Sequence, residues 1–224
     1  MTRPGIASRM GWGLSGVLFL FLIGCGEVNR QSPLRVTLEE GRYQSLPPLA
    51  PPAQRAGPIT SGFAEAGWIP ADGSEVPGRW EGIIIHHSGT RSGNAAQFDK
   101  WHRQQDWDGL GYHFVIDNGA GGPDGRVEVG YRWRNQMTGA HCREEQGDDN
   151  YWNEHTIGIC LVGNFELQQP TPKQYDSLGR LVRFLQKRYN IPTHRIIGHR
   201  DVKPTACPGR YFSWEELRRR LSKE

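Results

Sequence analysis

The stretch that most constrains the fold of this chain is residues 198–209, which read Gly-His-Arg-Asp-Val-Lys-Pro-Thr-Ala-Cys-Pro-Gly. His199 and Cys207 are residue types that bind zinc, and Pro204 stiffens the loop between them. Ligands on one helix face lie three or four residues apart. This wider spacing indicates instead that the first ligand ends a strand and that a rigid loop brings the chain back to the same site. A catalytic zinc ion usually has three protein ligands, so we expect a third ligand from elsewhere.

The apolar run Ile83–Ile85 is the obvious source of that ligand, because His86 and His87 follow it directly. A buried strand that ends in histidine presents an imidazole at the edge of a sheet. Successive side chains on a strand point to opposite faces, so alternation leaves open whether His86 or His87 faces the metal. Each piece alone is more often chance or packing than a metal site, but the two together, with Gly-Tyr-His-Phe at residues 111–114 between them, favour a metal site.

Alternating strand and helix patterns predict an α/β fold with a single mixed β-sheet flanked by α-helices, preceded by a disordered tether. Strands are expected at Ile83–Ile85, Tyr112–Ile116, Arg126–Val129, Thr156–Val162 and Ile196–Ile197. Helices are expected at Asn94–Gln105, after Thr171 and after Ser213. The last two carry capping boxes with Gln174 and Glu216. The apolar stripe of the helix after Thr171 is Tyr175, Leu178, Val182, Leu185 and Tyr189.

Residues 1–25 are predicted to be a lipoprotein signal peptide. The apolar core from Leu14 to Ile23 is shorter than the roughly 20 residues of a membrane-spanning helix. It ends in Leu-Ile-Gly-Cys, which resembles the lipobox of bacterial lipoproteins and makes Cys25 the lipidation site. An uncleaved anchor or a plain secretory signal is the alternative, and Met10 is an alternative start.

The organisation that follows is a proline-rich tether at residues 26–58 and a folded domain at residues 59–224. We expect the protein in the bacterial cell envelope, on the periplasmic side, held to the membrane by its N-terminal lipid. Gly26 follows the cysteine where an aspartate would favour the inner membrane, so the outer membrane is favoured.

The formal net charge of +3 is small and evenly spread, so we expect no nucleic-acid partner, and we expect a monomer. Arg218–Arg220 reads as the solvated face of a terminal helix. Cys142 and Cys160 could pair in an exported protein or remain buried thiols, and the sequence leaves both open.

Five segments in order resemble the zinc-dependent N-acetylmuramoyl-L-alanine amidases of type 2, a family that includes phage lysozyme-amidases and animal peptidoglycan recognition proteins. The segments are residues 83–90, 101–117, 139–141, 156–165 and 198–209. The resemblance covers roughly Trp80 to the last residue. It implies one zinc ion (Zn2+) held by His86, His199 and Cys207, with the first histidine of the pair as the ligand.

The resemblance also implies hydrolysis of the peptidoglycan amide between N-acetylmuramic acid and L-alanine by a metal-activated water. Tyr112 matches the family's tyrosine near the zinc and would assist as a hydrogen-bond donor. Its alternative is an ordinary half-buried strand aromatic. Thr205 stands where the phage enzymes carry lysine, so it would contribute a neutral hydroxyl instead of a full charge.

Four residues are expected to bind substrate or line its groove: His87, His141, Trp152 and Asn153. His141 and Asn153 match family groove positions, Trp152 would add a stacking surface, and each could instead be structural. Two rival functions stay open, a peptidoglycan-binding module without catalysis and a zinc peptidase acting on stem peptides. The presence of Cys207 favours the enzyme. The sequence does not indicate which stem peptide is preferred. It also does not indicate whether the substrate is an intact or an anhydro-muramoyl peptide.

Overall fold

The computed structural model describes residues 67–70, 74–142 and 150–222. The predicted signal peptide with Cys25, the predicted tether and the first residues of the predicted domain lie outside the described residues. None of the described helices is both long enough and apolar enough to cross a membrane.

The described chain is built on one mixed sheet of five strands in the order β3-β2-β4-β1-β5. The strands are β1 (Gly82–His87), β2 (Phe114–Ile116), β3 (Val127–Val129), β4 (Thr156–Leu161) and β5 (Ile196–Gly198). β1 runs parallel to both β4 and β5, β2 runs parallel to β4, and β3 pairs antiparallel with β2. This arrangement confirms the predicted α/β fold with a single mixed sheet.

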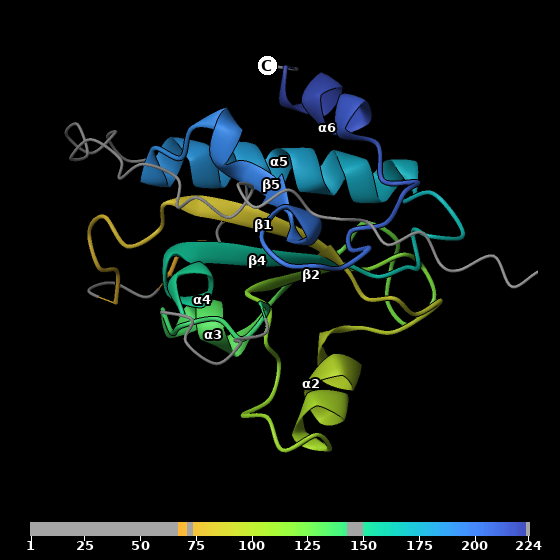
Figure 1. Ribbon diagram of the computed structural model, residues 1–224, viewed down its shortest axis with the longest axis horizontal. Coiled ribbons are helices and arrows are strands. Elements are labelled where there is room, and N and C mark those ends of the chain that lie inside the picture. Colours follow the sequence, from red (N-terminus) through yellow and green to blue (C-terminus); the bar gives the residue numbers. More distant parts are fainter. Residues whose placement is uncertain (1–66, 71–73, 143–149, 223–224) are drawn as a thin grey trace, which may run out of the picture. The chain divides into compact units, whose positions relative to one another are not determined.

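Helices cover both faces of the sheet, with α5 (Pro172–Tyr189) and α6 (Trp214–Leu221) on one side and α2 (Ala95–Arg103) on the other (Figure 1). Ile83 and Ile85 of β1 join the apolar cluster that contains the buried stripe of α5. Ile84 faces the opposite side and packs with Cys142 and Val202. Because both faces are covered, every residue of β4 and every residue of β1 except His87 is buried.

Thr171 and Ser213 cap their helices as predicted, and Asn94 caps α2, a cap that the sequence did not predict. Asn94 accepts a hydrogen bond from the backbone N–H of Gln97 at 2.8 Å, and Thr171 and Gln174 form the expected capping box of α5. Ser213 accepts from the backbone N–H of Glu216 at 3.1 Å at the start of α6. These caps satisfy backbone donors that no residue within the helix can pair.

The predicted elements differ from the structure mainly at their ends and in the shortest helices. β2 begins at Phe114 and not at Tyr112, because the ring Nδ1 of His113 accepts the backbone N–H of Gly158 at 3.0 Å and replaces a backbone partner. The sequence did not predict α3 (Tyr131–Arg134), α4 (Tyr151–His155), η1 (Thr193–Arg195) or η2 (His199–Asp201). Elements of three to five residues are too short for a recognisable hydrophobic period.

Parallel pairing brings the site together. The carboxyl ends of β1 and β5 lie side by side, with Ile85 opposite Gly198 in the register. His86 follows Ile85, and His199 follows Gly198. Ligands tend to bind at the carboxyl ends of parallel strands, where the loops leave the sheet. The fold therefore places His86 and His199 at the same edge.

Candidate metal centre and active site

His86, His199 and Cys207 each offer a metal-binding atom, and these atoms all lie within 4.8 Å of one another. Nδ1 of His86 is 3.8 Å from Sγ of Cys207, and the rings of His86 and His199 have centroids 4.5 Å apart. Zinc bonds of 2.0–2.3 Å in tetrahedral geometry separate ligand atoms by about 3.3–3.8 Å. The three side chains are thus close to the spacing that one zinc ion requires.

The loop that carries Cys207 is closed on itself by backbone hydrogen bonds. The N–H of Arg200 donates to the carbonyl of Cys207 at 2.8 Å, and the N–H of Lys203 donates to the carbonyl of His199 at 3.0 Å. The backbone N–H of His87 donates to Sγ of Cys207 at 3.3 Å, which ties the loop to β1. These hydrogen bonds hold the loop in one conformation, as expected for the rigid loop predicted from the sequence.

Burial determines the charge state of the three side chains. Burial, with smaller contributions from Lys203 and His87, lowers the pKa of His199 to about 4. It also lowers the pKa of His86 well below its usual value, with nearby histidines adding to the effect. Burial raises the pKa of Cys207, the backbone N–H of His87 and Arg200 partly offset this, and the net pKa is about 12. Two neutral imidazoles and a thiol that a cation would deprotonate are a donor set that zinc accepts.

A further observation fits a metal ion. Nε2 of His199 is buried and has no hydrogen-bond partner among the described residues. Buried polar atoms are nearly always paired, so such an atom calls for a partner. The donor types, their spacing and this unpaired nitrogen all fit zinc.

His86, and not His87, joins this group. Nδ1 of His87 accepts the backbone N–H of Phe165 at 3.0 Å, so its ring is held against the loop after β4. Burial lowers the pKa of His87, partly offset by Glu166. Strand alternation leaves open whether His86 or His87 faces the metal. In the structure His86 lies on the face of β1 that meets His199 and Cys207.

Tyr112 lies beside the three side chains, with its ring centroid 5.3 Å from that of His86. Burial raises the pKa of Tyr112 well above its usual value, and Cys160 and Cys207 raise it further. The phenol therefore keeps its proton at neutral pH and can act as a donor. Thr205 is exposed, and its hydroxyl accepts the backbone N–H of Cys207 at 3.2 Å. The catalytic roles of both residues stay predictions.

The predicted groove residues His141, Trp152 and Asn153 lie next to the site, and their contact with substrate stays a prediction. Asn153 is buried, and its Oδ1 accepts the backbone N–H groups of His141 and Cys142, both at 2.9 Å. Trp152 packs against the apolar cluster of Ile84, Cys142 and Val202. Asn153 thus fixes the backbone of His141 and Cys142 through these two hydrogen bonds.

A second group of metal-binding side chains, not anticipated from the sequence, shares His86 and adds His141 and Cys142. Nδ1 of His141 is 3.1 Å from Nε2 of His86 and 3.5 Å from Sγ of Cys142. Burial lowers the pKa of His141 to about 3 and raises that of Cys142 to about 12. The signal in the sequence was the Gly-Ala-His motif at residues 139–141, which gave no hint of its partner.

Cys142, Cys160 and Cys207 are all free and buried, so the structure has no disulfide between Cys142 and Cys160. Cys160 packs in the apolar cluster around Phe98 and Val115. Of the two alternatives left open by the sequence, the structure has the buried thiols.

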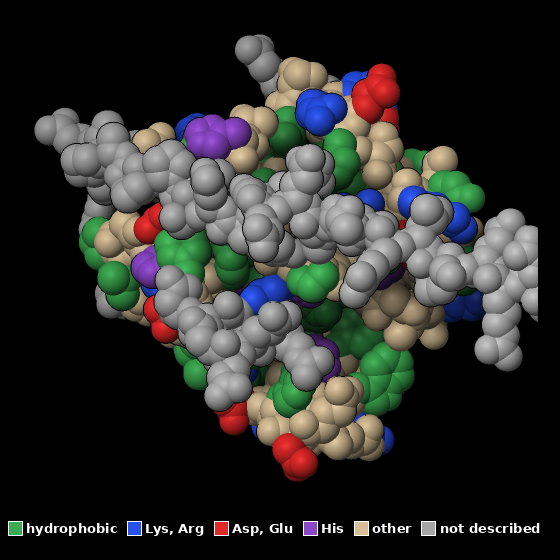
Figure 2. Space-filling view, viewed as in Figure 1, with side chains coloured by type: hydrophobic (Ala, Val, Ile, Leu, Met, Phe, Trp, Pro, Cys, Tyr) green, Lys and Arg blue, Asp and Glu red, His purple; other side chains and the backbone are tan. Residues whose placement is uncertain are grey.

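A row of rings leads outward from the site. The centroids of Tyr112 and His102 are 5.8 Å apart, and those of His102 and Trp107 are 4.7 Å apart. Trp107 is 47% exposed, which is unusual for so large a side chain. Trp107 lies in residues 101–117, a segment that resembles the family, but no signal in the sequence marked this side chain as part of the site. Figure 2 shows hydrophobic side chains in a hollow of the visible face, with histidine side chains at its edges.

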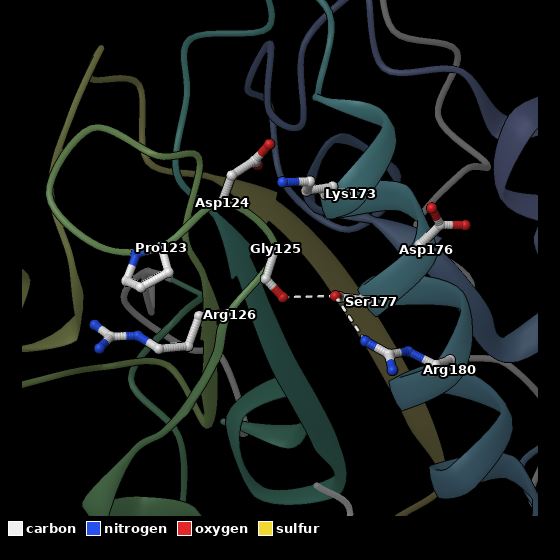
Figure 3. Close-up of a pocket in the computed structure, with 8 residues that line it drawn as sticks. All are labelled: Pro123, Asp124, Gly125, Arg126, Lys173, Asp176, Ser177 and Arg180. Carbon is white, nitrogen blue, oxygen red and sulfur yellow. Dashed lines mark hydrogen bonds between the residues drawn. The ribbon is translucent and has the colours of Figure 1, made fainter.

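A separate shallow pocket of about 340 Å³ lies between the β2–β3 loop and the first turns of α5 (Figure 3). Its basic side chains Arg126, Lys173 and Arg180 stand among the acidic Asp124 and Asp176. The hydroxyl of Ser177 donates to the carbonyl of Gly125 at 2.6 Å and accepts from Arg180 at 3.2 Å. The pocket contains none of the metal-binding residues, so it is not the candidate active site.

Comparison with known proteins identifies the family. The family Amidase_2, described as N-acetylmuramoyl-L-alanine amidase, matches residues 76–210, which include all three members of the first metal-binding group. This chain belongs to that family.

This amidase family member is similar to phage endolysins, to peptidoglycan-recognition proteins and to a solved amidase from Clostridium intestinale URNW. The endolysin of Enterobacteria phage T3 is 33% identical over 137 residues, covering 57% of this chain and 80% of the endolysin. Peptidoglycan-recognition protein 2 of Holotrichia diomphalia is 31% identical over 137 residues, covering 57% of this chain and 66% of that protein. The solved endolysin amidase LysCS from Clostridium intestinale URNW is 32% identical with a TM-score of 0.55, covering 65% of this chain and 86% of that one.

Proposed function

We propose that this protein hydrolyses the amide bond between N-acetylmuramic acid and the L-alanine of peptidoglycan, with one zinc ion held by His86, His199 and Cys207. The observation that carries this proposal is the convergence of their three metal-binding atoms within 4.8 Å. Membership of the amidase family gives the substrate class. A zinc ion bound there would polarise the scissile carbonyl and lower the pKa of a water molecule.

The protein's own groups have separate tasks in this reaction. His86 and His199 would hold the zinc ion as neutral imidazoles, and Cys207 would hold it as a thiolate after releasing its proton to solvent. Tyr112, beside His86 and protonated at neutral pH, donates a hydrogen bond to the carbonyl oxygen as that oxygen gains negative charge. Removing one such donor from an enzyme costs about 2.7–4 kcal/mol of transition-state stabilisation. Thr205 adds a weaker, neutral contribution, and it also fixes Cys207 through its backbone N–H.

We place the substrate beside the metal-binding group, along the row of rings that begins at Tyr112. Tyr112, His102 and exposed Trp107 form one apolar wall that suits the faces of a sugar or the stem peptide. His87, His141, Trp152 and Asn153 are proposed to line or support the groove.

Digestion of purified sacculi with the full-length protein tests the proposed function. Mass spectrometry should find stem peptides that begin with an unblocked L-alanine and glycan strands that keep the lactyl group. Binding to sacculi without released peptides would instead identify a peptidoglycan-binding module. Cleavage within the stem peptide would identify a peptidase. The matched control is Cys207→Ala, which should release nothing.

We also propose that Cys25 carries lipid and holds the protein on the periplasmic side of the bacterial envelope, at the outer membrane. The support is the lipobox-like Leu-Ile-Gly-Cys sequence at residues 22–25. A single acyl chain binds membranes only marginally, so stable anchoring requires the several chains of a mature lipoprotein. Residues 26–58 would then span the distance between the membrane and the peptidoglycan.

A further inference from the structure

The ring of His141 lies behind His86 and is only 6% exposed. Its Nε2 is 3.2 Å from the backbone carbonyl oxygen of Thr156, and its Nδ1 is 3.1 Å from Nε2 of His86. The two contacts use both nitrogens of one ring. They link the start of β4 to a side chain at the end of β1.

These contacts determine where the protons lie. A carbonyl oxygen only accepts, so Nε2 of His141 must carry the hydrogen that it shares with Thr156. In a neutral ring Nδ1 of His141 is then bare, and it accepts a hydrogen bond from Nε2–H of His86. Nδ1 of His86 then carries the lone pair, and this atom lies 3.8 Å from Sγ of Cys207, whose thiol hydrogen it can accept in the metal-free protein.

Two glycines make room for the ring of His141. A Cβ on Gly139 would lie 2.5 Å from Cδ2 of His141, and a Cβ on Gly158 would lie 2.5 Å from its Cγ. Ordinary contacts of this kind measure 3.4–4 Å. Gly158 stands in β4, where a glycine weakens a strand, so the space it leaves has a structural use.

The backbone around His141 is fixed as well. The N–H of Gly139 donates to the carbonyl of Asn153 at 2.9 Å, and the N–H of Ala140 donates to the carbonyl of Gly111 at 3.0 Å. With the bond from His141 N–H to Asn153 Oδ1, three consecutive residues are tied to neighbouring segments. The imidazole is therefore held in both position and orientation.

We propose that His141 is a positioning residue of the metal centre: with the carbonyl of Thr156, it holds His86 in the tautomer whose Nδ1 faces His199 and Cys207. This inference rests on the proposed zinc function. A histidine ligand is oriented by the partner of its other nitrogen, and loss of such a partner typically costs 10–100-fold in metal affinity. The competing arrangement is a second metal ion between His86, His141 and Cys142.

Nitrogen NMR of the full-length protein tests the tautomers without any substitution. With 15N-labelled histidine, His86 and His141 should both carry hydrogen on Nε2 in the metal-free protein. Addition of zinc should shift Nδ1 of His86 and leave His141 protonated on Nε2. A hydrogen on Nδ1 of His86, or a zinc-induced shift of Nδ1 of His141, would overturn the inference.

Zinc affinity separates positioning from mere packing. His141→Leu keeps much of the volume but loses the acceptor, and we expect zinc binding about 10–100-fold weaker in competition with a chromophoric chelator. His141→Asn returns an acceptor oxygen near the place of Nδ1 and should recover most of the affinity. Gly158→Ala, which changes no polar group, should weaken zinc by displacing the ring. Thermal melts of the metal-free variants would show whether each is folded.

The outcomes distinguish this inference from the proposed function. If the wild-type protein binds no zinc, the proposed function is wrong. If it binds one zinc ion but His141→Leu binds equally well, only the positioning role is wrong. Two zinc ions per chain, reduced to one by His141→Leu, would make His141 a ligand and overturn its positioning role.

Discussion

His86 lies directly opposite Cys160 in the parallel register of β1 and β4. Tyr112 packs against the apolar cluster that contains Cys160, and burial, with Cys160 adding to the effect, raises the pKa of the phenol well above its usual value. The neighbouring strand therefore places the phenol next to the metal-binding imidazole. Cys160, which from the sequence could be a small buried residue or half of a disulfide, is a buried thiol of the cluster against which Tyr112 packs.

The first prediction concerns this tyrosine. Tyr112→Phe removes one hydroxyl and little packing, so zinc content and fold should be unchanged. Turnover on a muramyl-peptide substrate should fall about 10²-fold, which corresponds to two to three kcal/mol. Steady-state kinetics with zinc measured by elemental analysis checks this. A variant with wild-type turnover would make Tyr112 a structural residue.

The second prediction distinguishes the two groups of metal-binding side chains. Cys207→Ala removes the thiolate from the group of His86 and His199, so zinc and hydrolysis should both be lost. Cys142→Ala is the matched control, because it removes a second buried thiol near His86 and should keep one zinc ion per chain. Elemental analysis after dialysis gives the stoichiometry. Zinc loss from the Cys142 variant alone would reverse the ligand assignment.

The third prediction concerns Thr205, where the chain differs from the phage pattern. Thr205→Ala should cost about 0.5–1.5 kcal/mol, the range of a single neutral hydrogen bond. Thr205→Lys restores a cation near the developing charge and should raise turnover. The measurement is kcat at saturating substrate for both variants. Loss of all activity in Thr205→Ala, with zinc retained, would show that Thr205 and not Tyr112 is the main donor.

The fourth prediction concerns the membrane anchor. Cys25→Ser should prevent lipidation, so the protein should leave the membrane fraction or keep its signal peptide. The mass of the mature chain and its distribution after cell fractionation report both effects. Unchanged mass and membrane retention in this variant would exclude lipidation at Cys25.

The fifth prediction is a pH effect on stability. Burial and the nearby Glu128 raise the pKa of Asp117, Arg126 partly offsets them, and the net pKa is about 6. Because the folded protein holds this proton more tightly than the unfolded chain, the contribution of Asp117 to stability falls as pH rises from about 4 to 7. The free energy of unfolding of wild type minus that of Asp117→Asn, from urea titrations, should decrease over this range. A difference that is constant or rises with pH would contradict the raised pKa.

Features that depend on neighbours along the chain were readable from the sequence. The capping box of Thr171 and Gln174 and the apolar stripe of α5 follow from side-chain spacing within one helix. The run Ile83–Ile85 and the loop from His199 to Cys207 were likewise recognisable as strand and rigid return. Family resemblance then supplied the ligand set that local pattern alone could not choose.

Only the tertiary structure gives the physical reason why His86 and not His87 joins the metal-binding group, because strand alternation is symmetrical until one face is covered. Packing of α5 against Ile83 and Ile85 leaves Ile84 and His86 on the opposite face. The bond between His86 and His141, 55 residues apart, needs the pairing of β1 with β4 and the space beside two glycines. Such a contact is fixed by strand register and packing across the sheet, so no spacing along the chain encodes it.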